Sequence, residues 1–228
     1  DPFGRDAITR IAVQTNSYIL VGSDQIEPSQ PPRYYNAAFL VGPDGRTLAV
    51  YRKMHLVPFG EYVPLKKVFF FVTPLVQAVS DFSAGDEAVL LRLGTHPFST
   101  AICFEVVYPD LVRRFVMAGS ELLTTITNDA WFGRSSAPYQ HFEQASLRAI
   151  ENGRYLVRSA NTGISGIVDP YGRVLQRSRL FESTVLVGEV RTLTGLTLYA
   201  RIGDLIAYLA TALTLVALGS AIVLGRRR

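Results

Sequence analysis

The chain has 228 residues, 48% of them hydrophobic and 11% aromatic, which excludes a wholly disordered protein because disorder requires low hydrophobicity. Residues 226–228, all arginines, supply three of the four surplus positive charges, so the rest of the chain has almost no basic excess for a nucleic-acid partner. The one cysteine, Cys103, excludes an internal disulfide framework and a thiolate-built zinc site. We expect one domain over residues 1–200, and because the chain begins at Asp1 rather than Met we expect it to be part of a longer protein.

The predicted elements are mostly strands, with helices between them. Residues 5–14 fit a short helix, and residues 17–23 fit a buried strand before the Pro-rich loop 27–33. The other elements that we expect are strands 37–41 and 47–51 in a hairpin, strands 88–93, 98–104, 122–127, 155–160, 165–168, 174–178 and 185–190, and helices 109–118 and 137–152. Helices that fall between strands in this way indicate sheets covered by helices.

Residues 205–224 are twenty consecutive uncharged and mostly apolar residues. Twenty residues at about 1.5 Å each span about 30 Å, the hydrocarbon thickness of a bilayer. We therefore predict a transmembrane helix rather than a buried core helix, which rarely stays apolar on every face. The basic tail, residues 225–228, places the C-terminus in the cytoplasm by the positive-inside rule and residues 1–200 on the opposite side. In a bacterium this predicts an inner-membrane protein with a periplasmic domain.

A long connection runs from Met54 to Asp86, and a loop of that length in a compact domain is more often functional than accidental. It contains three adjacent phenylalanines, residues 69–71, directly after Lys66 and Lys67. If this run is buried, it is a core strand. If it is exposed, it suits an arm at the lipid headgroup boundary.

Cys103 is the strongest candidate for chemistry, because a predicted strand runs into it and a predicted helix begins near Pro109. A strand-turn-helix arrangement presents a nucleophile at a sheet edge and directs backbone N–H groups at a developing oxyanion. The alternative is a buried structural cysteine. A nucleophilic cysteine needs activation, since its free pKa of about 8.5 leaves little thiolate at neutral pH.

Lys53 and Glu61 are candidates for that activation. The chain has twenty arginines and only three lysines, yet Lys53 directly follows Arg52. Lysine can transfer a proton or present a compact charge to an oxyanion, and arginine cannot release its proton. Glu61 follows eight residues later, in a loop stiffened by Pro58 and Pro64. Each of the two could instead be a solvated surface residue.

Five segments, taken in order along the chain, resemble the nitrilase superfamily and specifically the bacterial apolipoprotein N-acyltransferases. They are residues 52–64 (RKMHLVPFGEYVP), 101–105 (AICFE), 128–133 (NDAWFG), 140–141 with 148–151 (QH and RAIE) and 161–165 (NTGIS). The apolar C-terminal helix fits the same family. A lone lysine or cysteine would be weak support, whereas the ordered set is specific.

The resemblance implies an α/β fold, a nitrilase-like αββα sandwich, followed here by one C-terminal transmembrane helix. It implies a Glu–Lys–Cys triad that takes an acyl chain from a phospholipid, typically phosphatidylethanolamine, as a cysteine thioester. The acyl chain then passes to the α-amine of a diacylglyceryl-cysteine at a lipoprotein N-terminus. The implied partners are the phospholipid, the apolipoprotein and the membrane, with no cofactor. We expect no metal, because the three histidines lack metal-ligand spacing.

Carried over residue by residue, the resemblance makes Cys103 the nucleophile, Lys53 the triad lysine that helps to hold the oxyanion, and Glu61 an additional essential glutamate. Four further residues match motif positions that we expect to form the substrate pocket: Glu105, Phe104, Trp131 and Asn128.

Two departures from the family pattern affect this interpretation. The general base should be a glutamate before Lys53 in a Trp-Pro-Glu context, and the only glutamate there is Glu27, in the Pro-rich loop. We therefore expect the base and the family's other membrane helices to precede Asp1, and the isolated chain not to turn over. Phe104 stands where many members have tyrosine, which keeps stacking but removes a hydroxyl. A membrane-tethered amidase and a catalytically dead scaffold remain as alternative functions.

Overall fold

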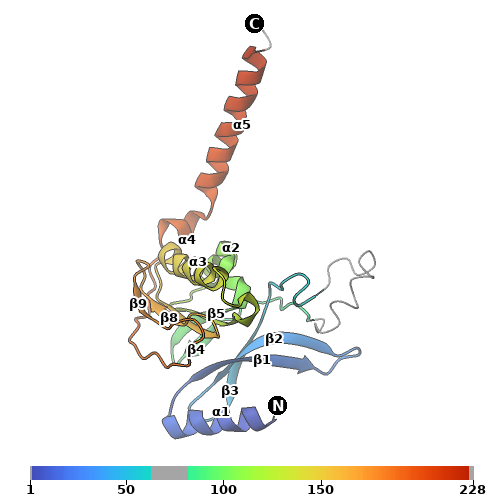
Figure 1. The fold of residues 1–228 in the computed structure, drawn as a ribbon, viewed down its shortest axis with the longest axis vertical. Coiled ribbons are helices and arrows are strands. Elements are labelled where there is room, and N and C mark those ends of the chain that lie inside the picture. Colours follow the sequence, from blue (N-terminus) through green and yellow to red (C-terminus); the bar gives the residue numbers. More distant parts are fainter. Residues whose placement is uncertain (1, 63–81, 226–228) are drawn as a thin grey trace.

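The computed structural model describes residues 2–62 and 82–225 (Figure 1). The three phenylalanines at 69–71 and the three arginines at 226–228 lie outside these residues. The interpretations of the phenylalanines as a core strand or a lipid-facing arm, and of the arginines as a cytoplasmic tail, therefore stay predictions. The elements are α1 (Pro2–Thr15), β1 (Ile19–Glu27), β2 (Arg33–Val41), β3 (Thr47–Arg52), β4 (Leu91–Leu93), β5 (His96–Ile102), the 3-10 helix η2 (Cys103–Val107), α2 (Pro109–Met117), β6 (Leu123–Asn128), the 3-10 helix η3 (Ala130–Phe132), α3 (Ala137–Asn152), β7 (Leu156–Asn161), β8 (Gly166–Val168), β9 (Val174–Arg177), α4 (Leu198–Ile202) and α5 (Leu205–Gly225).

The strands form two sheets that pack between helices. β1, β2 and β3 make an antiparallel sheet, and β4 to β9 make a second sheet in sequential order. Within it β5, β6 and β7 are parallel, and parallel neighbours need a crossover, which α2 and α3 supply. Figure 1 shows α2 and α3 on one face of the larger sheet, the smaller sheet on its other side, and α1 beneath the smaller sheet. The predicted αββα sandwich is confirmed.

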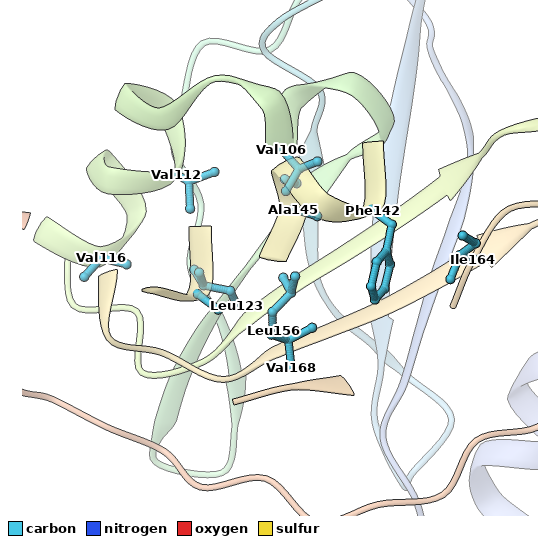
Figure 2. Packing of buried hydrophobic residues seen from close by; sticks show 11 residues of the cluster. Val106, Val112, Val116, Leu123, Phe142, Ala145, Leu156, Ile164 and Val168 are labelled. Atoms are coloured by element: carbon cyan, nitrogen blue, oxygen red, sulfur yellow. The ribbon is translucent and has the colours of Figure 1, made fainter. Parts of the chain in front are cut away.

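A cluster of buried apolar side chains lies between the two crossover helices and the larger sheet (Figure 2). α2 contributes Val112 and Val116, which lie one helical turn apart and therefore share one face. Leu123 and Leu156 face them from β6 and β7. Burying a side chain of this size stabilises the fold by about 1.5–3 kcal/mol. This cluster fixes the positions of the strand ends from which the candidate site is built.

Most predicted elements are present with shifted ends. The strand predicted at 37–41 begins at Arg33 in β2, the one predicted at 88–93 is reduced to Leu91–Leu93 in β4, and the one predicted at 98–104 ends at Ile102 in β5. Helix 137–152 is α3, and the strand predicted at 17–23 extends to Glu27 in β1. The strand predicted at 185–190 is wrong, because residues 182–190 have no regular secondary structure. The side chains of Val185 and Val187 are 85% and 80% exposed, and the Gln176 Nε2 group donates a hydrogen bond to the Val187 carbonyl. This side-chain hydrogen bond holds Val187 where the valine pattern predicted strand-to-strand backbone hydrogen bonds.

α5 extends away from the sandwich as one long helix (Figure 1). Its window from Leu205 to Ile222 has a mean hydropathy of 2.1, and none of it is buried. This helix is long and apolar enough to cross a membrane. The Arg113 guanidinium donates hydrogen bonds to the carbonyls of Ala200 and Arg201, which tie α4, just before α5, to α2.

Candidate active site

Cys103 lies in a tight turn where β5 ends and η2 begins. Its φ of 54° lies in the left-handed region, which costs a non-glycine residue about 1–3 kcal/mol and persists only where neighbouring contacts enforce it. Two contacts enforce it here. The Glu105 carboxylate accepts a hydrogen bond from the Ile102 N–H, 2.8 Å away, and His141 Nε2 lies 3.2 Å from the Cys103 carbonyl oxygen. The turn leaves Cys103 partly exposed, as a nucleophile requires.

Glu105 joins this turn to the segment that carries Lys53. Its Oε1 accepts hydrogen bonds from the Tyr51 hydroxyl at 2.9 Å and from the backbone N–H groups of Met54 at 2.7 Å and His55 at 3.0 Å. Its Oε2 accepts the bond from Ile102. Burial raises the pKa of the Glu105 carboxyl, and these four donors oppose that rise. With all four bonds made and no exposed surface, Glu105 holds two protein segments together and has no free oxygen for a substrate.

Lys53 forms a buried ion pair with Glu61. The side chain of Lys53 is 1% exposed, and its Nζ lies 2.6 Å from Glu61 Oε2. Asn36 Nδ2 donates to the other Glu61 oxygen at 2.9 Å, and the Val57 N–H donates to Oε2 at 2.8 Å. The interpretation of Lys53 as a solvated surface residue is therefore wrong. Burying an ion pair carries a desolvation cost that only good geometry and additional hydrogen bonds offset, and both are present here.

Asp129, His141 and Arg158 form a second buried polar cluster, which reaches the Cys103 carbonyl through His141. Asp129 Oδ1 lies 3.0 Å from His141 Nδ1, and Arg158 Nη2 donates to Asp129 Oδ2 at 2.8 Å. Burial alone would raise the pKa of Asp129, but its hydrogen bond to His141 and the charge of Arg158 lower it below the usual value. Because His141 also contacts the Cys103 carbonyl, this cluster positions the turn that carries Cys103.

The remaining predicted pocket residues are spread around this turn. The Phe104 ring packs edge-on against Tyr108, with centroids 5.8 Å apart, and lies 6.2 Å from the His141 ring. The Asn128 side chain accepts a hydrogen bond from the N–H of Ala130, the first residue of η3. Trp131 is 86% exposed. The structure thus brings Phe104 into the packing around Cys103 and leaves the Trp131 side chain in solvent.

Among the residues that the structure describes, Glu27 pairs with Arg52 rather than with Lys53. It accepts hydrogen bonds from Arg52 Nη2 and the Tyr35 hydroxyl, each at 3.1 Å, and these bonds lower its pKa. Within residues 2–62 and 82–225, the carboxylate paired with Lys53 is Glu61. Over the same residues, no group of three or more His, Cys, Asp and Glu side chains is arranged to hold a metal ion.

Sequence reasoning named neither Asn36 nor the cluster of Asp129, His141 and Arg158 as site residues. One signal was available for Asn36, because it interrupts the apolar run of β2, Arg33–Val41, with an amide. Asp129 and His141 lie inside the two motif segments that carry the family resemblance, and Arg158 lies in the middle of a predicted strand. Only packing shows that these three side chains meet.

The family model described as carbon-nitrogen hydrolase matches residues 5–197. The chain belongs to the carbon-nitrogen hydrolase family. It is 44% identical over 213 residues to the apolipoprotein N-acyltransferase of Geobacter metallireducens, in an alignment that covers 93% of this chain and 41% of that protein. It is 38% identical over 201 residues to the apolipoprotein N-acyltransferase of Pseudomonas aeruginosa, covering 85% of this chain and 38% of that protein. The resemblance read from the five segments is therefore confirmed, and the chain spans about two fifths of the length of these relatives.

Solved structures show a similar fold. An amidase from Nesterenkonia sp. AN1 superposes with a TM-score of 0.57 at 23% identity, covering 77% of this chain and 62% of that chain. Nit3 of Saccharomyces cerevisiae, a member of the nitrilase superfamily, superposes with a TM-score of 0.62 at 17% identity, covering 79% of this chain and 62% of that chain. At these identities the comparison supports the fold of the carbon-nitrogen hydrolase family rather than a particular reaction.

Proposed function

We propose that this chain carries the acyl-transfer domain of an apolipoprotein N-acyltransferase, with Cys103 as its nucleophile. The observation that carries the proposal is the Glu105 bridge. One buried carboxylate fixes the turn of Cys103 and the segment that follows Lys53. Together with 38–44% identity to proteins of that name, this arrangement favours acyl transfer through a thioester.

The proposed reaction has two balanced steps. The Cys103 sulfur attacks the ester carbonyl carbon of a phospholipid, and the carbonyl π electrons move to oxygen to form a tetrahedral oxyanion. Collapse of the oxyanion breaks the ester C–O bond, and the lysophospholipid leaves as the alcohol with the proton that the thiol gave up. The α-amine of a diacylglyceryl-cysteine then attacks the thioester, the C–N bond forms, the C–S bond breaks and the thiol regains a proton.

Lys53 and Glu61 have separate roles in this proposal. The Lys53 ammonium stabilises the oxyanion of both tetrahedral intermediates, a contribution that is large because the group is fixed in a site shielded from water. Glu61 holds that ammonium in place with help from Asn36 and Val57. Trp131, Asn128 and the ring of Phe104 belong to the substrate side of the site.

The membrane setting follows from α5. We propose that α5 anchors the domain to the bacterial inner membrane, with the sandwich in the periplasm and the basic C-terminus in the cytoplasm. An enzyme held there meets both proposed substrates, a phospholipid such as phosphatidylethanolamine and a diacylglyceryl-apolipoprotein, at the bilayer surface. A membrane-tethered amidase would share α5, so the named relatives are what favours this function over that alternative.

The test is intact-mass analysis of the full natural chain in detergent, incubated with phosphatidylethanolamine with and without a diacylglyceryl-cysteine peptide. We expect a hydroxylamine-sensitive acyl adduct that the peptide discharges and that Cys103→Ser abolishes. Lys53→Met should slow adduct formation by roughly 10²–10³-fold, the usual effect of removing an oxyanion donor. The exposed Arg92→Gln is the matched loss of a positive charge and should leave the rate unchanged. Absence of any adduct would leave the amidase or the dead scaffold.

A further inference from the structure

A cavity of about 380 Å³ lies beside the start of α3 and the end of β9. Its polar lining consists of Arg134, Ser135, Tyr139, Arg177, Ser178 and Arg179. The volume is at the small end of the range of about 300–1,000 Å³ that holds small-molecule ligands. The cavity uses none of Cys103, Lys53 and Glu61, so it is separate from the proposed reacting groups.

In the part of the chain that the structure describes, the three arginines that line the cavity form no ion pair with an acidic side chain. Among residues 2–62 and 82–225, no carboxylate lies within ion-pair distance of Arg134, Arg177 or Arg179. Glu182 accepts a hydrogen bond from the backbone N–H of Arg179 rather than from its side chain, and Arg134 lies over the Phe181 ring at 4.9 Å. Three like charges around one cavity repel each other, and a bound anion would relieve that repulsion.

The lining matches the chemistry of a phosphate group. Arginine binds phosphate oxygens through two parallel N–H bonds, and the hydroxyls of Ser135 and Tyr139 can add neutral donors. We propose that this cavity binds the phosphodiester of a glycerophospholipid headgroup and so orients the acyl donor. The assignment to a lipid rests on the proposed acyl transfer, whereas the assignment to a phosphate rests on the cavity alone.

A short chain of contacts connects the cavity to the nucleophile turn. Ile164 lines the cavity, and its carbonyl accepts a hydrogen bond from Arg158 Nε at 3.1 Å. Arg158 contacts His141 at 3.1 Å, and His141 contacts the Cys103 carbonyl. Ile164 also belongs to the apolar cluster of Figure 2, which fixes this wall of the cavity. A headgroup held here would lie two side chains away from the Cys103 backbone.

The test compares two triple variants of the full natural chain in detergent. The first, Arg134→Gln with Arg177→Gln and Arg179→Gln, removes the three cavity charges. The control removes the same number of exposed charges from α1 and the β2–β3 turn, by Arg5→Gln, Arg10→Gln and Arg46→Gln. Binding is measured by calorimetry in a Cys103→Ser background with two probes, sn-glycero-3-phosphoethanolamine and inorganic phosphate. Adduct formation from phosphatidylethanolamine is measured with Cys103 intact.

We expect the cavity variant to weaken glycerophosphoethanolamine binding about tenfold or more, since a charge-assisted hydrogen bond is worth at least that factor. Its KM for phosphatidylethanolamine should rise by a similar factor with kcat unchanged, and the control should change neither. Loss of phosphate binding without a rise in KM would overturn the lipid assignment, leaving a site for free phosphate. Equal effects in both variants, or no binding of either probe, would overturn the cavity proposal even if the thioester forms. Binding that only the cavity variant loses, without any thioester, would support the cavity and refute the acyl transfer.

Discussion

Replacing Glu105 by glutamine tests whether this residue is a structural bridge or a substrate contact. The carboxylate accepts three hydrogen bonds at Oε1, from Tyr51, Met54 and His55, and one at Oε2, from Ile102. A glutamine has one oxygen and one NH₂ group. If its oxygen takes the three donors, its NH₂ faces the Ile102 N–H, so two donors oppose each other in a site without solvent.

The expected cost follows from these contacts. A buried donor left without an acceptor costs about 1–3 kcal/mol, and the three remaining bonds weaken because their acceptor is no longer charged. We expect Glu105→Gln to lower the free energy of unfolding by about 2–4 kcal/mol, which for a chain of this size lowers the Tm by roughly 5–15 °C. This loss should appear without any substrate, because the donors belong to the protein.

Thermal and denaturant unfolding in detergent measure the effect, with Glu143→Gln as the control. Glu143 is an exposed glutamate of α3, so the same chemical change there should alter stability by less than about 0.5 kcal/mol. Alkylation of Cys103 in the folded protein gives a second readout, since a loosened turn changes the accessibility of the thiol. Equal stability of the two variants would refute the bridging role and return Glu105 to the substrate pocket.

Three further predictions concern the Asp129 cluster and the isolated chain. A Cβ on Gly163 would lie 2.8 Å from the Cβ of Asp129, so Gly163→Ala should lower the unfolding free energy by about 1–3 kcal/mol. In the control, Gly195→Ala, the new Cβ has no atom within 4 Å, so the unfolding free energy should change by about 0.5 kcal/mol or less. Similar denaturation midpoints for the two variants would count against the tight contact. Because the pKa of Asp129 is lowered in the folded protein, the contribution of its carboxylate to stability is complete above the unfolded pKa of about 4 and is lost as the pH falls further. Asp129→Asn should therefore flatten that part of the stability–pH curve. An unchanged curve would contradict the ion pair. Within residues 2–62 and 82–225, the carboxylate paired with Lys53 is Glu61, which we assign to holding the ammonium rather than to acting as base. We therefore expect the 228-residue chain by itself not to catalyse multiple acyl transfers, and repeated turnover in a mass-spectrometric assay would disprove this.

The family and its order of elements could be predicted from local sequence. The strand entering Cys103, the helix over 137–152 and the lysine segment are recognisable because each depends on residues close together in the chain. The strand predicted at 185–190 failed for the opposite reason. A strand exists only where a neighbour offers backbone partners, and the valine alternation carries no information about that neighbour.

The amino-acid sequence by itself determined that this is an α/β chain with one cysteine in a strand-to-helix turn, one lysine beside an arginine and one apolar segment long enough to cross a bilayer. Only the tertiary structure decided that Glu105 bridges the Cys103 turn and the segment after Lys53, that Lys53 and Glu61 are paired out of water, and that three arginines line one cavity. Periodicity and propensity act over a few residues. A hydrogen bond across 51 positions, such as that from Met54 to Glu105, depends on how the sheets and helices pack, which no local pattern encodes.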